Sequence, residues 1–391
     1  MNIEQLIKER CPDGVDIRAL WDICDILDNQ RRPVSKDQRE EWDIPYYWAN
    51  GIQDYVKDYL FDGTFLLVWE DWSVINKDNS PVLNWAEWKI WVNNHAHILQ
   101  EIMDVALLRY IYYYLQTVDV SNIVRWVPPK LNQQNLRNIE IKLPPIEVQN
   151  EIVNILDKFT ELEAELEAEL EARKTQYEYY RDKLLSFENQ QRERLENFEW
   201  KTIGQLSSYR RGSFPQPYWN AEWYDWEWAM PFVQVADIWD DKKLVEDTKR
   251  KISKLAQPMS VFAPKWTIII SLQWSIWRIA ITQYDAYIDR TVAIFNDISE
   301  SVLKKYFVYQ LERIFAKKEK TARWATIKTI TKEEFTEFTI PVPSMKEQER
   351  IVNILDRFEK LTNDITEWLP AEIQMRHKQY EYYRDKLLTF N

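Results

Sequence analysis

The sequence predicts an α+β protein made of two similar halves, in which a mixed domain of strands and helices precedes a long helix. Three observations indicate this architecture: a segment that occurs twice, an apolar stripe of helical period in both copies, and runs of strand-forming residues before each copy. The 391 residues are enough for two domains with hydrophobic cores of their own.

The repeated segment begins as IKLPPIEVQNEIVNILDKF at Ile141 and recurs as IPVPSMKEQERIVNILDRF at Ile340, 199 residues later. Its end, QYEYYRDKLLSF at Gln176, recurs as QYEYYRDKLLTF at Gln379. A period of about 200 residues is too long for a solenoid, so we interpret it as an internal pseudo-twofold repeat. The predicted variable domains are residues 1–143 and 191–343, and the predicted repeated helices are residues 144–190 and 344–391.

Both repeated segments have the pattern of an amphipathic helix. Each begins after a proline, Pro145 or Pro343, and apolar residues follow at steps of three and four. The first helix is expected from about Glu147 to Phe187, which is about 60 Å at 1.5 Å per residue. Its middle, Glu161–Ala172, consists of three ELEA tetrads.

A single helix this long and this charged needs a partner, and the second copy is the obvious candidate. We therefore predict that a long antiparallel two-helix coiled coil joins the domains, with two independent surface helices as the alternative. Pro370 is expected to kink or interrupt the second helix near Trp368.

Each variable domain mixes strand and helix patterns. The apolar runs FLLV (Phe65–Val68) and TIIIS (Thr267–Ser271) predict buried strands. The segments 98–116 and 302–315 have helical period and occupy similar positions in their halves. Both domains are therefore expected to be α+β.

Composition narrows the class of protein. No apolar run approaches 18 residues and the first residues contain no signal-peptide core, which predicts a soluble, cytoplasmic protein. Two cysteines and three histidines leave little material for a disulfide framework or a metal site. The net charge of −12 argues against broad, non-specific coating of DNA, although residues 191–343 carry 23 Lys and Arg against 20 Asp and Glu.

The order of variable domain, repeated helix, variable domain and repeated helix resembles the specificity (S) subunit of type I restriction–modification enzymes. The similarity covers essentially the whole chain. The segments that carry it are LPPIEVQNEIVNILDKF with YEYYRDKLL, their second copies, DILDNQRRPVS, IPYYWANGIQDYV, WVNNHAHIL and PKWTIIISLQWSIWRIA.

This resemblance implies two target-recognition domains that each read one half of a split, asymmetric site in double-stranded DNA. The helices are then a spacer and a docking surface for two modification (methyltransferase) subunits, which bind S-adenosylmethionine. Restriction (translocase/endonuclease) subunits are a further implied partner. The sequence contains no phosphate-binding GxxxxGK[ST] and no methyltransferase Pro-Pro-Tyr/Phe motif, so we expect no catalytic residues, cofactor or metal on this chain.

Side chains with paired donors or acceptors are the physical candidates for base reading, because Arg can bind guanine and Asn or Gln can bind adenine with two hydrogen bonds. The predicted DNA-binding residues are Asn29, Gln30, Arg31, Arg32, Asn50, Gln53, Arg210, Arg211, Gln216, Gln273, Ser275 and Arg278. Asn93, Asn94 and His95 are alternatives, for which a structural turn is an equally good interpretation.

The tetrads suggest a molecular ruler. Four helical residues add about 6 Å, against about 3.4 Å per base pair of duplex DNA. Our hypothesis is that adding or deleting one tetrad shifts the spacer between half-sites by about one or two base pairs. The alternative for the whole chain is a two-headed coiled-coil scaffold whose α+β heads bind proteins and not DNA.

The chain has 5 glycines and 20 tryptophans, the reverse of ordinary usage. Aligning the halves puts Trp21 opposite Gly204 and Trp266 opposite Gly63, and several tryptophans lie where a turn needs glycine. The family resemblance implies small residues at Trp48, Trp69, Trp72, Trp88, Trp274 and Trp277. We hypothesise that most of these codons are UGA read as Gly in the organism; true core or base-stacking tryptophans are the alternative.

Overall fold

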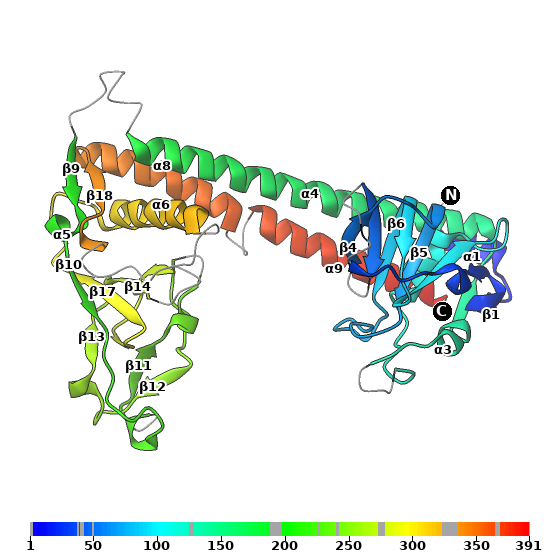
Figure 1. Ribbon diagram of the computed structural model, residues 1–391, viewed down its shortest axis with the longest axis horizontal. Coiled ribbons are helices and arrows are strands. Elements are labelled where there is room, and N and C mark those ends of the chain that lie inside the picture. The colour runs from blue at the N-terminus through cyan, green and yellow to red at the C-terminus, as the bar shows by residue number, and fades with distance from the viewer. Residues whose placement is uncertain are drawn as a thin grey trace. The chain divides into compact units, whose positions relative to one another are not determined.

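The computed structural model describes residues 3–36, 39, 43–48, 51–124, 129–187, 198–224, 227–239, 242–272, 278–322, 335–363 and 368–390. The chain divides into two compact units (Figure 1). Unit 1 is Met1–Glu167 together with Glu372–Asn391, and unit 2 is Ala168–Ala371. Among the described residues, no helix has a stretch long and apolar enough to cross a membrane.

Unit 1 is built on a six-stranded sheet of order β2-β7-β5-β6-β3-β4. Its central strand β5 contains the apolar run Phe65–Trp69, every residue of which is buried, as expected for a strand covered on both faces. Helix α2 packs against β5 and β7. The elements of this unit outside α4 and α9 are α1 (Ile3–Arg10), β1 (Asp16–Ala19), η1 (Leu20–Asp22), β2 (Cys24–Ile26), η2 (Asp28–Gln30), β3 (Ile44–Trp48), β4 (Gly51–Val56), β5 (Phe61–Trp69), β6 (Leu83–Val92), β7 (Ala96–Glu101), α2 (Leu108–Leu115), α3 (Gln133–Arg137) and β8 (Glu140–Leu143).

Unit 2 contains two four-stranded sheets, β10-β17-β14-β15 and β12-β11-β16-β13. Residues Ile268–Ser271 of β14 are all buried, which confirms the strand predicted there. Outside α4 and α9, the elements are β9 (Glu199–Thr202), α5 (Ile203–Leu206), β10 (Ser208–Arg211), η4 (Ala221–Trp223), β11 (Met230–Val233), η5 (Val235–Asp237), β12 (Arg250–Ile252), η6 (Gln257–Met259), β13 (Val261–Ala263), β14 (Ile268–Ser271), β15 (Ile279–Ile281), β16 (Ala286–Ile288), β17 (Val292–Asn296), α6 (Lys304–Ala322), β18 (Thr339–Val342) and α8 (Met345–Asn363).

The repeated segments form helices that pair antiparallel. Helix α4 (Ile146–Ser186) contributes to both units, and α9 (Trp368–Thr389) lies almost wholly in unit 1. In unit 1, Phe159 of α4 stacks on Tyr383 of α9 with ring centroids 5.4 Å apart, and Glu163 Oε1 lies 2.8 Å from His377 Nδ1. The contacts move forward along α4 and backward along α9, so the helices run in opposite directions.

The second repeated segment has Pro370 at the start of a described helix, and residues 364–367 lie outside the described residues. Helix α8 ends at Asn363 and α9 begins at Trp368, so Pro370 lies in the first turn of α9. A proline is tolerated there because the N–H groups of the first turn have no partner within the helix. The predicted kink or interruption near Trp368 borders residues that the structure does not describe, and it stays a prediction.

A buried glutamine attaches each domain to its helix. Gln149 Oε1 accepts a hydrogen bond from Leu107 N at 2.9 Å, and Gln149 Nε2 donates to Pro144 O at 2.8 Å. In the second half, Gln348 Oε1 accepts from Leu303 N at 2.8 Å and Gln348 Nε2 donates to Pro343 O at 2.9 Å. Both side chains are at most 1% exposed, and the duplicated bonds confirm the internal repeat in three dimensions.

Two expectations from the sequence need correction. The segment 98–116 was expected to be helical, but residues 98–101 belong to strand β7 and the helix, α2, begins only at Leu108. A short apolar run has no period that separates strand from helix. Strand register confirms Trp21 as the counterpart of Gly204, since β1–β8 and β9–β18 pair in the same way. The other alignment is wrong by one residue, because the pairing of β5 with β7 and of β14 with β17 places Trp266 opposite Thr64.

Tryptophan occupies backbone conformations that favour glycine. Ten described non-glycine residues have positive φ, and four of them are Trp72 (71°), Trp88 (67°), Trp228 (67°) and Trp266 (71°). All four side chains are exposed, from 57% to 79%. A bulky residue is an outlier in this region, which favours the glycine hypothesis at these four positions.

Not every tryptophan on the chain fits that hypothesis. Trp69 is 1% exposed in the core of unit 1 and has no positive φ, so the structure gives no support to a glycine there. Trp274 and Trp277 lie outside the described residues.

Mass spectrometry of the native protein tests the glycine hypothesis directly. We expect peptides that cover positions 72, 88, 228 and 266 to have the mass of glycine at each position, because the backbone there is left-handed. Tryptophan mass at position 72 in protein from the source organism contradicts recoding.

Glycine should also stabilise the chain as written. Changing Trp72→Gly, Trp88→Gly, Trp228→Gly and Trp266→Gly should each raise the free energy of unfolding by about 0.5–1 kcal/mol, since relief of the left-handed conformation exceeds the entropy that glycine adds to the unfolded chain. The matched control Trp69→Gly should lower it by about 3–5 kcal/mol, because it empties a core site. Denaturant unfolding measures both; a quadruple variant no more stable than the starting chain contradicts the interpretation.

Candidate nucleic-acid interface

In unit 1, the described base-reading candidates lie on or next to η2 and β4. Strand β2, which precedes η2, and strand β4 are at opposite edges of the six-stranded sheet. Asn29 and Gln30 of η2 are exposed, as are Arg32 just after it and Gln53 on β4. Asn50 lies outside the described residues. Four of the six candidates in this domain therefore have side chains that a ligand can reach.

Arg31 differs from its neighbours because its guanidinium is used inside the domain. Its Nη1 donates to Glu70 Oε2 at 2.7 Å and to Ala96 O at 2.8 Å, and its Nε donates to Asp28 O at 3.0 Å. The side chain is 13% exposed. Arg31 therefore links η2 to the residue that follows β5 and to the start of β7 by hydrogen bonds.

The same network holds a buried ion pair. His97 is fully buried, with Nδ1 2.6 Å from Asp28 Oδ2 and Nε2 2.8 Å from Leu131 O. Both ring nitrogens therefore face oxygen acceptors, a carboxylate and a backbone carbonyl. Burial raises the pKa of Asp28, but the hydrogen bond and charge of His97 and the charge of Arg31 outweigh burial and hold this pKa below its ordinary value.

In unit 2 as well, some predicted base-reading residues are exposed and one has a structural partner. Arg210 and Arg211 on β10 are exposed, and so is Gln216 in the segment after this strand. Gln273 and Ser275 lie outside the described residues. Arg278 is half-buried, and its Nη1 donates to Ile238 O at 3.0 Å, which gives its guanidinium a structural partner.

The alternative candidates Asn93, Asn94 and His95 form the turn between β6 and β7. Asn93 is buried and its Oδ1 accepts from His95 N at 2.8 Å, while His95 Nδ1 lies 3.0 Å from Asp71 Oδ2. Asn93 and His95 therefore serve the turn itself. Asn94, at the tip of the turn, has an exposed side chain.

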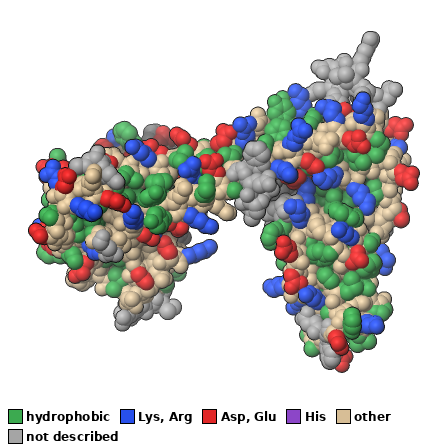
Figure 2. All heavy atoms as spheres, turned by 180° about the vertical axis from the view of Figure 1, so that it is seen from behind, with side chains coloured by type: hydrophobic (Ala, Val, Ile, Leu, Met, Phe, Trp, Pro, Cys, Tyr) green, Lys and Arg blue, Asp and Glu red, His purple; other side chains and the backbone are tan. Residues whose placement is uncertain are grey.

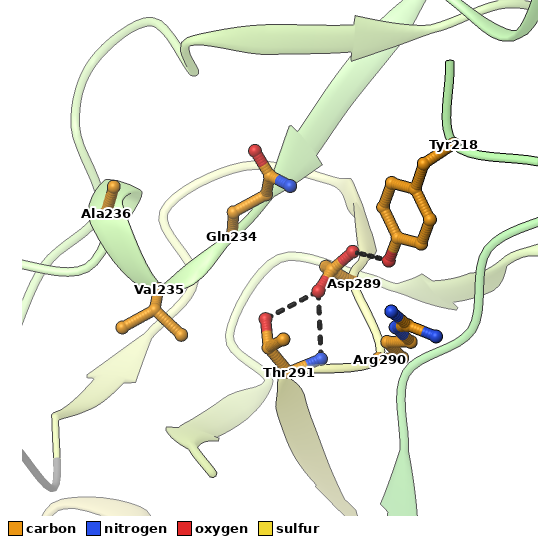
Figure 3. A pocket seen from close by; sticks show the side chains of 7 residues that line it. All are labelled: Tyr218, Gln234, Val235, Ala236, Asp289, Arg290 and Thr291. Atoms are coloured by element: carbon orange, nitrogen blue, oxygen red, sulfur yellow. Dashed lines mark hydrogen bonds between the residues drawn. The ribbon is translucent and has the colours of Figure 1, made fainter. Parts of the chain in front are cut away.

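Unit 2 has an arginine near a surface hollow that the sequence did not single out. A hollow of about 340 Å³ is lined by Tyr218, Gln234, Val235, Ala236, Asp289, Arg290 and Thr291 (Figure 3). Arg290 is exposed and lies in the turn between β16 and β17. The signal that could have found it is the correspondence of this turn with Asn93–His95, which only strand pairing makes visible.

Charge on the surface is mixed. On the face shown in Figure 2, the Lys and Arg side chains of the described residues are interspersed with Asp and Glu. In the basic segment 249–251, Lys251 pairs with Asp247 at 3.0 Å and Arg250 lies over the Tyr224 ring at 4.9 Å. This arrangement fits local contacts to phosphates and bases better than general attraction to DNA.

Comparison with known proteins decides the family. The sequence profile of the type I restriction modification DNA specificity domain matches the chain twice, over residues 12–172 and 196–375. This chain is a type I specificity subunit. It therefore has two recognition domains and is the non-catalytic, DNA-recognising component of a type I restriction–modification system.

Similar specificity subunits come from several bacteria. A putative type I restriction enzyme specificity subunit of Haemophilus influenzae is 33% identical over 398 residues, covering 96% of each chain. The specificity subunit of EcoR124I/EcoR124II from Escherichia coli is 30% identical over 416 residues, covering 98% of this chain and 96% of that one. The solved S subunit from M. genitalium has a TM-score of 0.56 at 14% identity, covering 95% of this chain and 96% of that one, and this likeness concerns the fold alone.

The Asp28 network predicts a specific loss of acid stability in the specificity subunit. Because the folded pKa of Asp28 is below its unfolded value, the ion pair stabilises the fold above the unfolded pKa, and this contribution disappears as pH falls through the folded pKa. Asp28→Asn should therefore lower the free energy of unfolding by about 3 kcal/mol at pH 7. The deficit should shrink below about pH 4.

Unfolding by denaturant at pH 7 and at pH 3 to 5 measures this difference. Asp25→Asn is the control, since Asp25 is exposed and its removal should change stability by less than about 0.5 kcal/mol. An Asp28→Asn deficit that is constant from pH 7 to pH 3 contradicts the assignment.

Proposed function

We propose that the two recognition domains each read one half of a bipartite, asymmetric site in double-stranded DNA. The observation that carries this proposal is that the two domains are mounted on their helices by the same bonds but present different side chains. Gln149 and Gln348 make equivalent bonds to the following helix and the preceding domain. The exposed candidates differ between the two domains: Asn29, Gln30, Arg32 and Gln53 in the first, and Arg210, Arg211 and Gln216 in the second.

The two domains are joined to their helices by equivalent bonds but expose different side chains. This combination supports a DNA site made of two different halves with a set spacing. Amide side chains suit adenine and guanidinium groups suit guanine. Each surface contains both kinds of group, but in different numbers and on different elements, so the two surfaces favour different base sequences. The antiparallel helices between the domains provide the spacing in this proposal.

The proposed docking partners are two modification subunits, one for each copy of the repeat. Tyr179 and Tyr382 occupy equivalent positions in YEYYRDKLL and are 61% and 62% exposed. Two equivalent exposed tyrosines suit two copies of one partner, since tyrosine is enriched at protein interfaces. S-adenosylmethionine then belongs to these partners, restriction subunits complete the assembly, and action on chromosomal DNA places it in the cytoplasm.

Variation of the tetrads tests the proposed spacing. A variant that lacks one ELEA tetrad of Glu161–Ala172 loses about 6 Å of helix, so its methylated sites should keep both half-sites with a spacer shorter by about one or two base pairs. The assay is methylation-sensitive sequencing of cells that express the subunit with its cognate modification subunit.

The control replaces one tetrad by another helix-forming tetrad of equal length, such as ELEA→QLQA, which should leave the spacer unchanged. An unchanged spacer in the deletion variant rejects the ruler. Absence of any bipartite methylated site, with an intact complex, rejects half-site reading and favours the protein-binding scaffold.

A further inference from the structure

One turn occurs at the same place in both recognition domains. Asn93 N donates to Tyr47 O at 3.2 Å and Asn93 Oδ1 accepts from His95 N at 2.8 Å. In the second domain, Asp289 N donates to Val233 O at 3.0 Å and Asp289 Oδ1 accepts from Thr291 N at 2.9 Å. Each turn follows a strand that pairs in parallel with β3 or β11, so the residues at the two tips, Asn94 and Arg290, are structural counterparts.

Arg290 is held in place by an aromatic side chain. Its guanidinium carbon lies 4.9 Å from the centre of the Tyr218 ring. The hydroxyl of Tyr218 donates to Asp289, which is 1% exposed, and Thr291 Oγ1 donates to the same carboxylate at 2.5 Å (Figure 3). Burial and Asp289 both raise the pKa of Tyr218, so the ring stays neutral beneath the guanidinium.

The hydrogen-bonding capacity of Arg290 is available to a ligand. Its side chain makes no hydrogen bond or ion pair with the described part of the chain, and it is exposed. A guanidinium fixed by stacking and free of carboxylates presents a fork of N–H donors that matches O6 and N7 of guanine.

The backbone beneath Arg290 is packed against a glycine. A Cβ at Gly212 would approach Asp289 O to 2.2 Å and Ile288 O to 2.4 Å, so no other residue fits. Gly212 N also donates to Val292 O at 2.9 Å, and Ser213 N donates to Ile288 O at 3.1 Å. These contacts hold the turn from below and fix the direction in which Arg290 leaves it.

In the first domain, Arg31 supports the corresponding turn. Its Nη1 lies 3.3 Å from Asn94 O and 2.8 Å from Ala96 O, and its own position is fixed by Glu70. The side chain of Asn94 is exposed and makes no hydrogen bond among the described residues. Its paired acceptor and donor match N6 and N7 of adenine.

We propose that this turn is a specificity-determining element of both domains, in which Arg290 reads a guanine of one half-site and Asn94 reads an adenine of the other. The proposal rests on the proposed function and adds to it the residue and the base at each site. Arg31 and Gly212 are positioning residues, because they support the turns and do not face the ligand.

The experiment uses the complete complex of specificity and modification subunits with Arg290→Lys and Asn94→Asp variants. Lysine keeps the charge but loses the fork, and aspartate keeps the shape but loses the donor to N7. Methylation-sensitive sequencing should show Arg290→Lys tolerating other bases at one G·C pair of one half-site, and Asn94→Asp doing so at one A·T pair of the other half-site. Discrimination at each pair should fall about 5- to 150-fold.

Two matched controls and a second readout keep the result clear. Arg137→Lys and Asn138→Asp change exposed residues at the end of α3, remote in sequence from both turns, and should leave the methylated sequence unchanged. Replacing the implicated guanine by 7-deazaguanine removes N7 and should weaken binding of the unaltered complex, but not of the Arg290→Lys complex.

Different results would overturn the base-reading turn and the proposed reading of a bipartite site. Unchanged methylated sequences in both variants, or equally weaker binding to all sequences with a lower salt dependence, overturn the base-reading turn and indicate phosphate contacts at most. A complex of the starting protein that methylates no bipartite site overturns the proposed function, and the turn with it.

Discussion

Two buried glutamines, Gln149 and Gln348, determine how the rest of the structure is assembled. Each sits one turn into a repeated helix and bonds backward to the proline carbonyl before the helix and sideways to the domain. An amide buried without partners costs about 1–3 kcal/mol, so the helix start and the domain must adopt this one arrangement together. Tyr110 and Tyr306 strengthen it by donating to Lys142 O and Pro341 O, at 2.5 and 2.9 Å. These bonds hold the domain of each half against the first turn of its helix, as the proposed ruler requires at that end.

With the mounting held constant, the loops and turns of the two domains can diverge. In the first domain, Arg31 is bonded to Glu70 and to backbone carbonyls, and the residue at the tip of the turn is Asn94. In the second, a glycine takes the supporting role, and an arginine at the tip rests on a tyrosine. The same backbone turn thus presents different side chains held by different contacts, in agreement with the proposed reading of two unlike half-sites.

The sequence predicted the repeated elements well and the site less well. Helix α4 was predicted to within about a residue because its apolar stripe persists for more than ten turns, a local signal. Strand β7 was missed at Ile98–Glu101 because its identity depends on pairing with β2 and β5, which no local period encodes. Arg31 was predicted as a base reader because sequence shows only its donors, whereas its acceptors come from residues up to 65 positions away. The sequence did not single out Arg290 for the same reason, since its stacking on Tyr218, 72 positions earlier in the chain, is visible only in the fold.

The tryptophans bear on the interface as well as on stability. Trp48 follows Tyr47, whose carbonyl anchors the first turn, and its indole meets the His95 ring edge-on with centroids 5.4 Å apart. The corresponding residue of the second domain is Gln234, which lines the hollow beside Arg290. Trp48 has no positive φ, so only the resemblance to specificity subunits implies a small residue at this position. If position 48 is glycine in the organism, the edge-on contact with His95 is absent. In that case the indole results from translation of a UGA codon as tryptophan, and position 48 offers no platform on which a base can stack.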